Sequence, residues 1–182
     1  TPTEIVKYMV DKTLSKVCEG KTPSEILNIS VADIACGSGI FLEEAFAYLQ
    51  DYCVQWYICN GQTDHLIETG IDLYKLPLQE KKDILCSCIY GIDIDIHAVE
   101  VAKFSLLIKL IEDETAPSVS EVVPILPDLG DNIQFGNSLV SQTELNGISG
   151  ANHQMMEIAP FDWSTINNGC GFDVIIGNPP YV

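Results

Sequence analysis

Positive charge is scarce in this sequence of 182 residues. Nine Lys and Arg stand against 26 Asp and Glu, which gives a formal net charge of -17 at pH 7. Basic side chains that neutralise phosphates supply most non-specific affinity for nucleic acids, so the chain is not expected to bind DNA or RNA freely by itself. If its substrate is DNA, the basic surface has to lie on chain outside these residues.

Long hydrophobic runs are also lacking. No stretch approaches the roughly 18 to 20 apolar residues of a membrane span, and the first ten residues lack the basic flank and apolar region of a secretory signal. The 47% content of hydrophobic residues is typical of a globular α/β domain. We therefore expect one domain over residues 1–182, a cytoplasmic location and no membrane partner.

Patterns of metal ligands are missing as well. The three histidines are scattered, and the seven cysteines form an odd set in mainly apolar surroundings. Cys86-Ser87-Cys88 is a CxC without a second cysteine pair or a nearby histidine, so we expect no metal site. Reduced thiols fit this pattern best.

Short apolar segments alternate with helical patterns, which is typical of a doubly wound, mostly parallel α/β sheet. The four expected strands are residues 27–34, 88–95, 132–139 and 173–177. The expected helices are residues 1–18, with Thr1 as a candidate cap, then 43–58, 77–88 and 96–112. Residues 140–171 form a long connection with one short helix near 161–166. Apolar positions of the helix at 96–112 include Val99, Ala102, Phe104, Leu107 and Leu110.

A glycine-rich turn follows the first expected strand. It reads Asp33-Ile34-Ala35-Cys36-Gly37-Ser38-Gly39. Small residues let a ligand approach the backbone, and the next helix offers free N–H groups. The dinucleotide pattern GxGxxG requires a third glycine where Leu42 stands, which weakens an NAD interpretation. Asp33 suits a ligand that carries an amino group and a sulfonium, although a plain strand-to-helix turn remains an alternative.

Polar side chains end the next two strands. Asp93 and Asp95 close the second, and we expect Asp95 to cap the following helix and leave Asp93 free. A carboxylate at this tip is placed to accept hydrogen bonds from a ribose diol. Asn137 follows the third strand, where its amide oxygen and a neighbouring backbone N–H can meet an adenine edge.

The last stretch joins an apolar strand to Asn178-Pro179-Pro180-Tyr181. The fixed φ angles of the prolines hold Asn178 on a rigid corner. The Asn178 oxygen and the Pro179 carbonyl can accept both hydrogens of a ring amine and make its nitrogen more nucleophilic. Tyr181 can stack on the ring. An ordinary turn is the alternative.

Taken together, TPTEIVKYMV, DIACGSG, GIDID, GNSL and DVIIGNPPY resemble the motifs of S-adenosylmethionine-dependent adenine-N6 DNA methyltransferases of the gamma class. The sequence is most similar to the methyltransferase portion of type IIG restriction-modification enzymes. The resemblance implies a Rossmann-like class I fold with strand order 3-2-1-4, truncated after NPPY, with a helical insertion at 43–88. It also implies S-adenosylmethionine as cofactor and double-stranded DNA as partner, bound through regions outside these residues.

The resemblance also assigns roles to single residues. Cofactor-binding residues would be Thr1, Asp33, Ala35, Cys36, Gly37, Ser38, Gly39, Asp93, Ile94, Asn137, Ser138 and Asn178. Thr1 would close over the methionine part, Asp93 would hold the ribose and Ile94 would pack on the adenine. Catalytic residues that hold the target adenine would be Asn178, Pro179, Pro180 and Tyr181. Many relatives have aspartate where Asn137 stands.

Other interpretations remain open at this stage. The NPPY ending also serves methyltransferases that act on RNA or on a protein glutamine. A non-catalytic scaffold that retains the fold is a further alternative. The isolated chain is expected to lack methylation activity, and an exposed strand edge makes self-association a further expectation.

Overall fold

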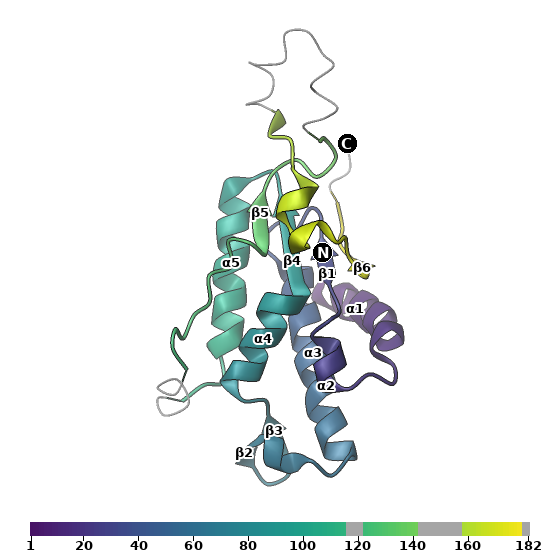
Figure 1. The fold of residues 1–182 in the computed structure, drawn as a ribbon, viewed down its shortest axis with the longest axis vertical. Coiled ribbons are helices and arrows are strands. Elements are labelled where there is room, and N and C mark those ends of the chain that lie inside the picture. The colour runs from purple at the N-terminus through teal and green to yellow at the C-terminus, as the bar shows by residue number, and fades with distance from the viewer. Residues whose placement is uncertain (116–121, 142–157, 180–182) are drawn as a thin grey trace.

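A four-stranded parallel sheet organises the computed structural model, which describes residues 1–115, 122–141 and 158–179 (Figure 1). Its strands are β1 (Val31–Asp33), β4 (Ile89–Asp93), β5 (Ile133–Phe135) and β6 (Val174–Ile175). They lie in the order β5-β4-β1-β6, with Val31 paired to Ile89 on one side and to Val174 on the other. In chain order this is third, second, first and fourth, so the predicted strand order is confirmed.

In the part of the chain that the structure describes, the sheet is accompanied by five α-helices, by shorter 3-10 turns and by a separate two-stranded hairpin. The α-helices are α1 (Thr3–Cys18), α2 (Pro23–Ile26), α3 (Ile40–Cys59), α4 (Leu78–Cys88) and α5 (Ile96–Ile111). Shorter elements are the 3-10 turns η1 (Thr63–His65), η2 (Trp163–Thr165) and η3 (Asn167–Gly169) and the antiparallel strands β2 (Ile67–Gly70) and β3 (Leu73–Lys75). The hairpin lies at the lower end of the molecule in Figure 1, and the carboxyl ends of the central strands point to the upper end.

Each face of the sheet has its own apolar cluster. Alternate strand residues such as Val31 and Ile89 pack with buried residues of α1, α3, α4 and α5. Their neighbours Ala32 and Tyr90 pack on the other face with residues of segment 158–172. The central strands β1 and β4 are covered on both faces and almost wholly apolar, as expected for a parallel sheet. A Cβ at Gly91 would come within 2.7 Å of Leu42 Cδ1, so glycine lets α3 approach β4 closely.

Polar side chains fix the edge strands in place. Asp173 Oδ2 accepts hydrogen bonds from the backbone N–H and the hydroxyl of Ser30, both at 2.8 Å, which docks the start of β6 on β1. On the other side, the amide of Asn132 donates to the carbonyl oxygens of Cys86 and Ile89 at 2.8 and 2.9 Å. These bonds set the register in which the strand tips meet.

Several expected boundaries are wrong in instructive ways. Residues 27–30 belong to the end of α2 and its turn, because Asn28 and Ile29 donate their N–H groups to carbonyls of that helix. The first helix begins at Thr3 with Pro2 at its N-cap position and no side-chain cap, so Thr1 does not cap it. The region 43–88 is α-helical only in α3 and α4, because the 3-10 turn η1 and the β2–β3 hairpin separate these helices.

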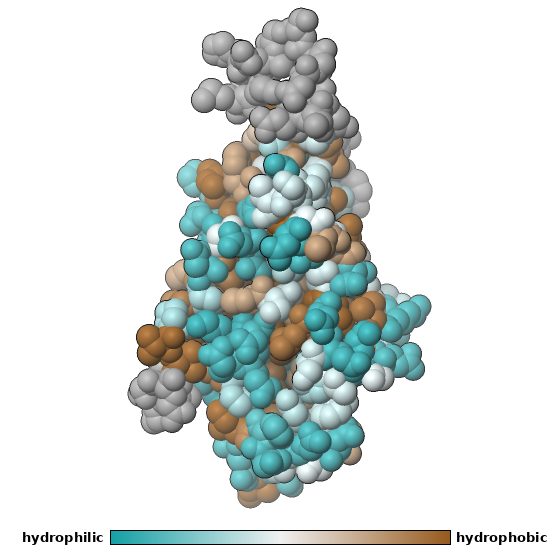
Figure 2. All heavy atoms as spheres, viewed as in Figure 1, coloured by the Kyte–Doolittle hydropathy of each residue, from teal (hydrophilic) through white to brown (hydrophobic). Residues whose placement is uncertain are grey.

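The seven cysteines are free thiols, as expected. Burial raises the pKa of Cys36 and of Cys88 to about 12, so both stay protonated and behave as small apolar side chains. Within the described residues, no helix has the length and apolar character needed to cross a membrane. On the face shown in Figure 2, hydrophobic residues form separate patches among hydrophilic ones.

Candidate active site

The carboxyl ends of β1, β4, β5 and β6 surround one pocket. Its volume is about 270 Å³, and it is lined by Ile34, Ala35, Asp93, Ile94, Gly136, Asn137, Ser138, Leu139 and Pro179. These residues come from four separate parts of the sequence, each directly after a strand. Crevices at this edge of a doubly wound sheet are where such folds bind ligands.

The glycine turn contributes Ile34 and Ala35 to one wall of the pocket, and its glycines lie behind them. Gly37 and Gly39 have φ angles of 54° and 90°, which lie in the left-handed region that favours glycine. A Cβ on Gly39 would also approach Ala102 Cβ of α5 at 3.1 Å. The turn is tied to the sheet because Cys36 donates its N–H to the carbonyl of Ile92 at 3.0 Å.

Asp93 connects this turn to the tip of β4. Its Oδ2 accepts the N–H of Gly37 at 2.7 Å, and its Oδ1 accepts the N–H of Asp95 at 2.9 Å. The expectation that Asp93 is free is therefore wrong, although each oxygen retains a further lone pair for a ligand. Asp95 caps α5 as predicted, because its Oδ1 accepts the N–H of His97 at 2.9 Å.

Asp33 is the buried carboxylate of the site. Only 2% of its surface is exposed, and its Oδ1 accepts the N–H of Ala35 at 3.0 Å. Burial, with a smaller contribution from the nearby charge of Asp93, raises the pKa of Asp33 to about 6. The same carboxylate packs on Gly177, where any Cβ would overlap it. A cationic group is the ligand that would stabilise such a carboxylate.

Asn137 and Ser138 form the opposite wall. Ser138 Oγ donates to the carbonyl of Ile34 at 2.7 Å and so joins the exit of β5 to the glycine turn. Asn137 Oδ1 accepts the N–H of Leu139 at 3.0 Å, so the amide oxygen is turned back on its own loop. Its predicted contact with an adenine edge stays a prediction, and in this arrangement the amide nitrogen is the group left to make it.

The two ends of the described chain meet beside the pocket. Asn178 Nδ2 donates to Thr1 Oγ1 at 3.0 Å, which leaves the Asn178 oxygen out of that bond. Pro179 lines the pocket together with Asp93 and Asn137. The amide that precedes the prolines and the glycine turn therefore share one edge of the sheet. Pro180 and Tyr181, the other predicted catalytic residues, lie outside the described residues.

Of the predicted cofactor-binding residues, the pocket wall contains Ala35, Asp93, Ile94, Asn137 and Ser138. Asp33 and Gly37 lie behind the wall and hold it through hydrogen bonds. Ile34, Gly136 and Leu139 line the pocket but carry no polar signal that a sequence pattern would single out. Their position directly after a strand is the signal that could have found them.

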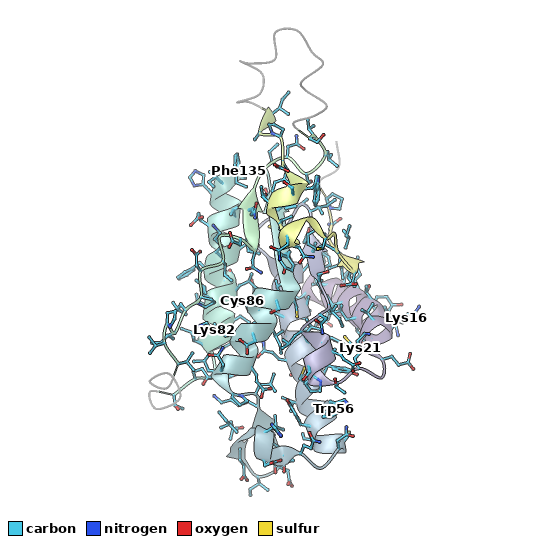
Figure 3. The ribbon with its side chains drawn as sticks, in the orientation of Figure 1. Lys16, Lys21, Trp56, Lys82, Cys86 and Phe135 are labelled. Carbon is cyan, nitrogen blue, oxygen red and sulfur yellow. The ribbon has the colours of Figure 1, made fainter. Side chains whose placement is uncertain are left out.

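Negative charge dominates the polar groups of this edge. Asp33, Asp93 and Asp95 lie there, whereas the labelled cations Lys16, Lys21 and Lys82 in Figure 3 lie lower in the molecule, away from Phe135 at the upper end of the sheet. An acidic edge with a half-exposed apolar Ile94 suits a cationic ligand that also has an apolar ring.

Comparison with known proteins gives a consistent result. The model of the Eco57I restriction-modification methylase family matches residues 87–182. The whole chain is 44% identical to 17% of the length of the type II restriction enzyme and methyltransferase RM.Eco57I of Escherichia coli. A further relative, RM.MjaORFECS2P of Methanocaldococcus jannaschii, is 34% identical over 137 residues, which are 72% of this chain and 11% of that protein. The chain therefore spans less than a fifth of either relative.

Proposed function

The chain belongs to the Eco57I restriction-modification methylase family, and from this premise we propose that it transfers a methyl group from S-adenosylmethionine to N6 of an adenine in double-stranded DNA. The observation that carries the proposal is the meeting of Asp33, Asp93 and Asn178 at one edge of the sheet. Asp33 and Asn178 are 145 positions apart in the sequence. Asp93 lines the pocket, Asp33 lies directly behind its wall, and Asn178 precedes Pro179, which also lines it.

The pocket residues fit the proposed cofactor. A buried carboxylate, Asp33, suits its amino group, and Asp93 suits the ribose hydroxyls. Ile34 and Ile94 offer apolar surface to the adenine ring. When bound, S-adenosylmethionine supplies an electrophilic methyl carbon on a sulfonium, and the acidic edge favours that positive charge.

The chain's own contribution to the transfer is to hold the target amine. The bond from Asn178 Nδ2 to Thr1 fixes the amide so that its oxygen is the free acceptor. That oxygen and the Pro179 carbonyl accept the two hydrogens of the amine, which favours a tetrahedral, more nucleophilic nitrogen. With the cofactor bound, the held amine would be placed in line with the methyl carbon, so the N–C bond would form as the C–S bond breaks, the amine would lose one proton, and no covalent intermediate on the enzyme would be needed.

We further propose that these residues act within a longer polypeptide. The curated relatives are far longer than the chain, which covers 17% and 11% of them. A net charge of -17 disfavours contact with the DNA backbone, and flipping the target base costs a few kcal/mol that other DNA contacts must offset. Residues 1–182 alone are therefore expected not to methylate duplex DNA.

Two measurements test this function. Calorimetry with S-adenosylmethionine on the wild-type chain and on Asp33→Ala tests the cofactor site, with the exposed-loop variant Asp64→Ala as control. Transfer of a tritiated methyl group by the full-length polypeptide onto duplex DNA, ribosomal RNA and a glutamine-bearing protein tests the substrate. Methylation of RNA or protein in preference to DNA would overturn the proposed substrate. If Asp64→Ala reduced the heat of S-adenosylmethionine binding as much as Asp33→Ala does, the proposed cofactor site would be overturned.

A further inference from the structure

Helix α5 has a second apolar face that points away from the core. Its inner face packs on the sheet through Val99, Ala102, Leu106 and Leu110, all of which are buried. Besides Ile96 at its first position, which is 46% exposed, four apolar side chains of the helix remain exposed, namely Val101 at 49%, Phe104 at 65%, Ile108 at 47% and Ile111 at 36%. We call these four residues the α5 outer seam.

The spacing of the outer seam is that of a helix-pairing surface. The four residues follow one another at intervals of three, four and three, which places them on one stripe of the helix. Alternating intervals of three and four are the a and d positions of a heptad, where side chains pack between those of a neighbouring helix. Scattered exposed apolar residues need no explanation, but a continuous stripe of four on one helix indicates a partner.

Charge argues against a second copy of this chain as that partner. Two chains that each carry -17 repel, since a large net charge of one sign keeps proteins monomeric. Both ends of α5 are also acidic, with Asp93 and Asp95 before it and Glu112 and Asp113 after it. The two lysines of the helix are already paired with acidic residues, Lys103 with Glu100 at 3.1 Å and Lys109 with the C-cap residue Glu112 at 2.7 Å. A complementary helix therefore has an apolar stripe and basic residues near its ends.

We propose that the α5 outer seam docks an amphipathic, basic-flanked helix that belongs to the same polypeptide outside residues 1–182. The relative that is 44% identical over this whole chain has more than four fifths of its length outside the aligned region, so the family has the chain to supply such a helix. The proposal rests on the part of the proposed function that places these residues within a longer polypeptide. It does not depend on the identity of the cofactor or of the methylated base.

Photocrosslinking in the full-length polypeptide tests the docking. Benzoylphenylalanine replaces Phe104, and the matched control places it at Tyr8 of α1, an aromatic residue with nearly the same exposure, 64% against 65%. The expected result is an intramolecular crosslink from position 104 to a segment outside 1–182 that has apolar residues at intervals of three and four and Lys or Arg beside them. The yield at position 8 is expected to be lower by about tenfold, as for an unoccupied surface.

Two variants sharpen the experiment. With the crosslinker at Ile108, Phe104→Glu is expected to reduce the yield about tenfold because it places a carboxylate in the seam, whereas Tyr8→Glu leaves the yield unchanged. An unchanged melting temperature of the 1–182 chain carrying Phe104→Glu would show that the helix itself is intact. Crosslinks between two copies, crosslinks to DNA, or a yield at position 104 no higher than at position 8 would each overturn the proposal. Methyl transfer measured on the same samples reports separately on the proposed function.

Discussion

The carboxylate of Asp33 lies directly against the backbone of Gly177. A methyl group on Gly177 would come within 2.8 Å of Asp33 Cγ, although the two residues are far apart in the sequence. This contact sets the side-by-side position of the glycine turn after β1 and the Asn178 corner after β6. The carboxylate of Asp33 therefore has room beside β6 only because residue 177 has no side chain.

Gly177→Ala is therefore expected to destabilise the fold by about 1 to 3 kcal/mol, as overpacking of a filled site does. The buried Asp33 cannot move away without losing its bond to the Ala35 N–H. Urea unfolding measures the change. Gly130→Ala is the matched control, because its added methyl would meet only the carboxylate of Asp128 at 3.2 Å. Equal midpoints for the two variants would contradict the packing argument.

The raised pKa of Asp33 leads us to predict that the free energy of unfolding depends on pH. Its pKa rises from 3.8 to about 6 in the fold because burial disfavours the charged form. The folded chain then holds this proton more tightly than the unfolded chain, so the contribution of Asp33 is fully favourable below pH 3.8 and is lost as the pH rises through about 6. Asp33→Asn removes the ionisation, and its stability relative to wild type is expected to grow by about 3 kcal/mol over this interval.

Urea unfolding of both proteins at pH 4, 5, 6 and 7 checks this expectation. The comparison is a difference between two chains that share every other carboxylate, so the titrations of carboxylates that do not interact with Asp33 cancel. The exposed Asp64→Asn serves as control and is expected to track wild type at each pH. A constant difference between Asp33→Asn and wild type would show that folding does not raise the pKa of Asp33.

The strand tips and the edge of the sheet where they meet followed from local sequence patterns, whereas the strand order was implied by the resemblance to a known family. Apolar runs that end in DIACGSG, GIDID and GNSL identified three strand tips, and parallel connections bring such tips to one edge. The cap at Asp95 was predictable because an acidic residue directly before an apolar periodic stretch is a typical helix start. These signals depend on neighbouring residues alone.

The features that sequence reasoning missed depend on distant contacts. Nothing near Asp93 in the sequence shows that Gly37, 56 residues earlier, donates a hydrogen bond to it. Asn137 was predicted from its side-chain chemistry, but the turn after β5 uses its oxygen for Leu139. Phe104 was counted among the apolar positions of its helix, and only the packing of α5 shows that it points outward. The β2–β3 hairpin mixes polar and apolar residues in strands of only four and three residues, which hid these strands within a region expected to be helical.

A buried ion pair near the hairpin leads to a prediction about stability. The side chain of Glu114 is 1% exposed and accepts from Lys81 at 2.7 Å and from Lys75 at 3.1 Å, which joins α4 to β3. Glu114→Gln is expected to cost about 3 to 5 kcal/mol, because Lys81 is left as an uncompensated buried charge. Glu112 lies two residues before Glu114 and forms an exposed pair with Lys109. Glu112→Gln breaks this pair and is expected to cost no more than about 1 kcal/mol. Thermal unfolding of both variants separates the two cases, and similar losses would indicate that the Glu114 pair is effectively solvated.

Asp93 permits a test that separates its structural role from a direct contact with the cofactor. In the structure its oxygens hold the N–H groups of Gly37 and Asp95, so Asp93→Asn disturbs the glycine turn whatever the ligand. If Asp93 also accepts hydrogen bonds from the ribose, removal of a ribose hydroxyl should weaken binding to wild type more than to the variant. Hydrogen bonds to a charged group are worth about 1.5 to 3 kcal/mol, which corresponds to roughly a tenfold to hundredfold loss of affinity.

Calorimetry on the full-length polypeptide makes this comparison, with S-adenosylmethionine and its 2′-deoxy analogue each bound to wild type and to Asp93→Asn. Wild type is expected to discriminate between the two ligands by at least about tenfold, and Asp93→Asn is expected to discriminate much less. Ser138→Ala is the control, because it removes the bond to the Ile34 carbonyl on the opposite wall and disturbs the turn without touching a ribose acceptor. If Asp93→Asn weakens both ligands by the same factor, as Ser138→Ala is expected to do, then Asp93 acts only by holding Gly37, and the ribose must be bound by another group.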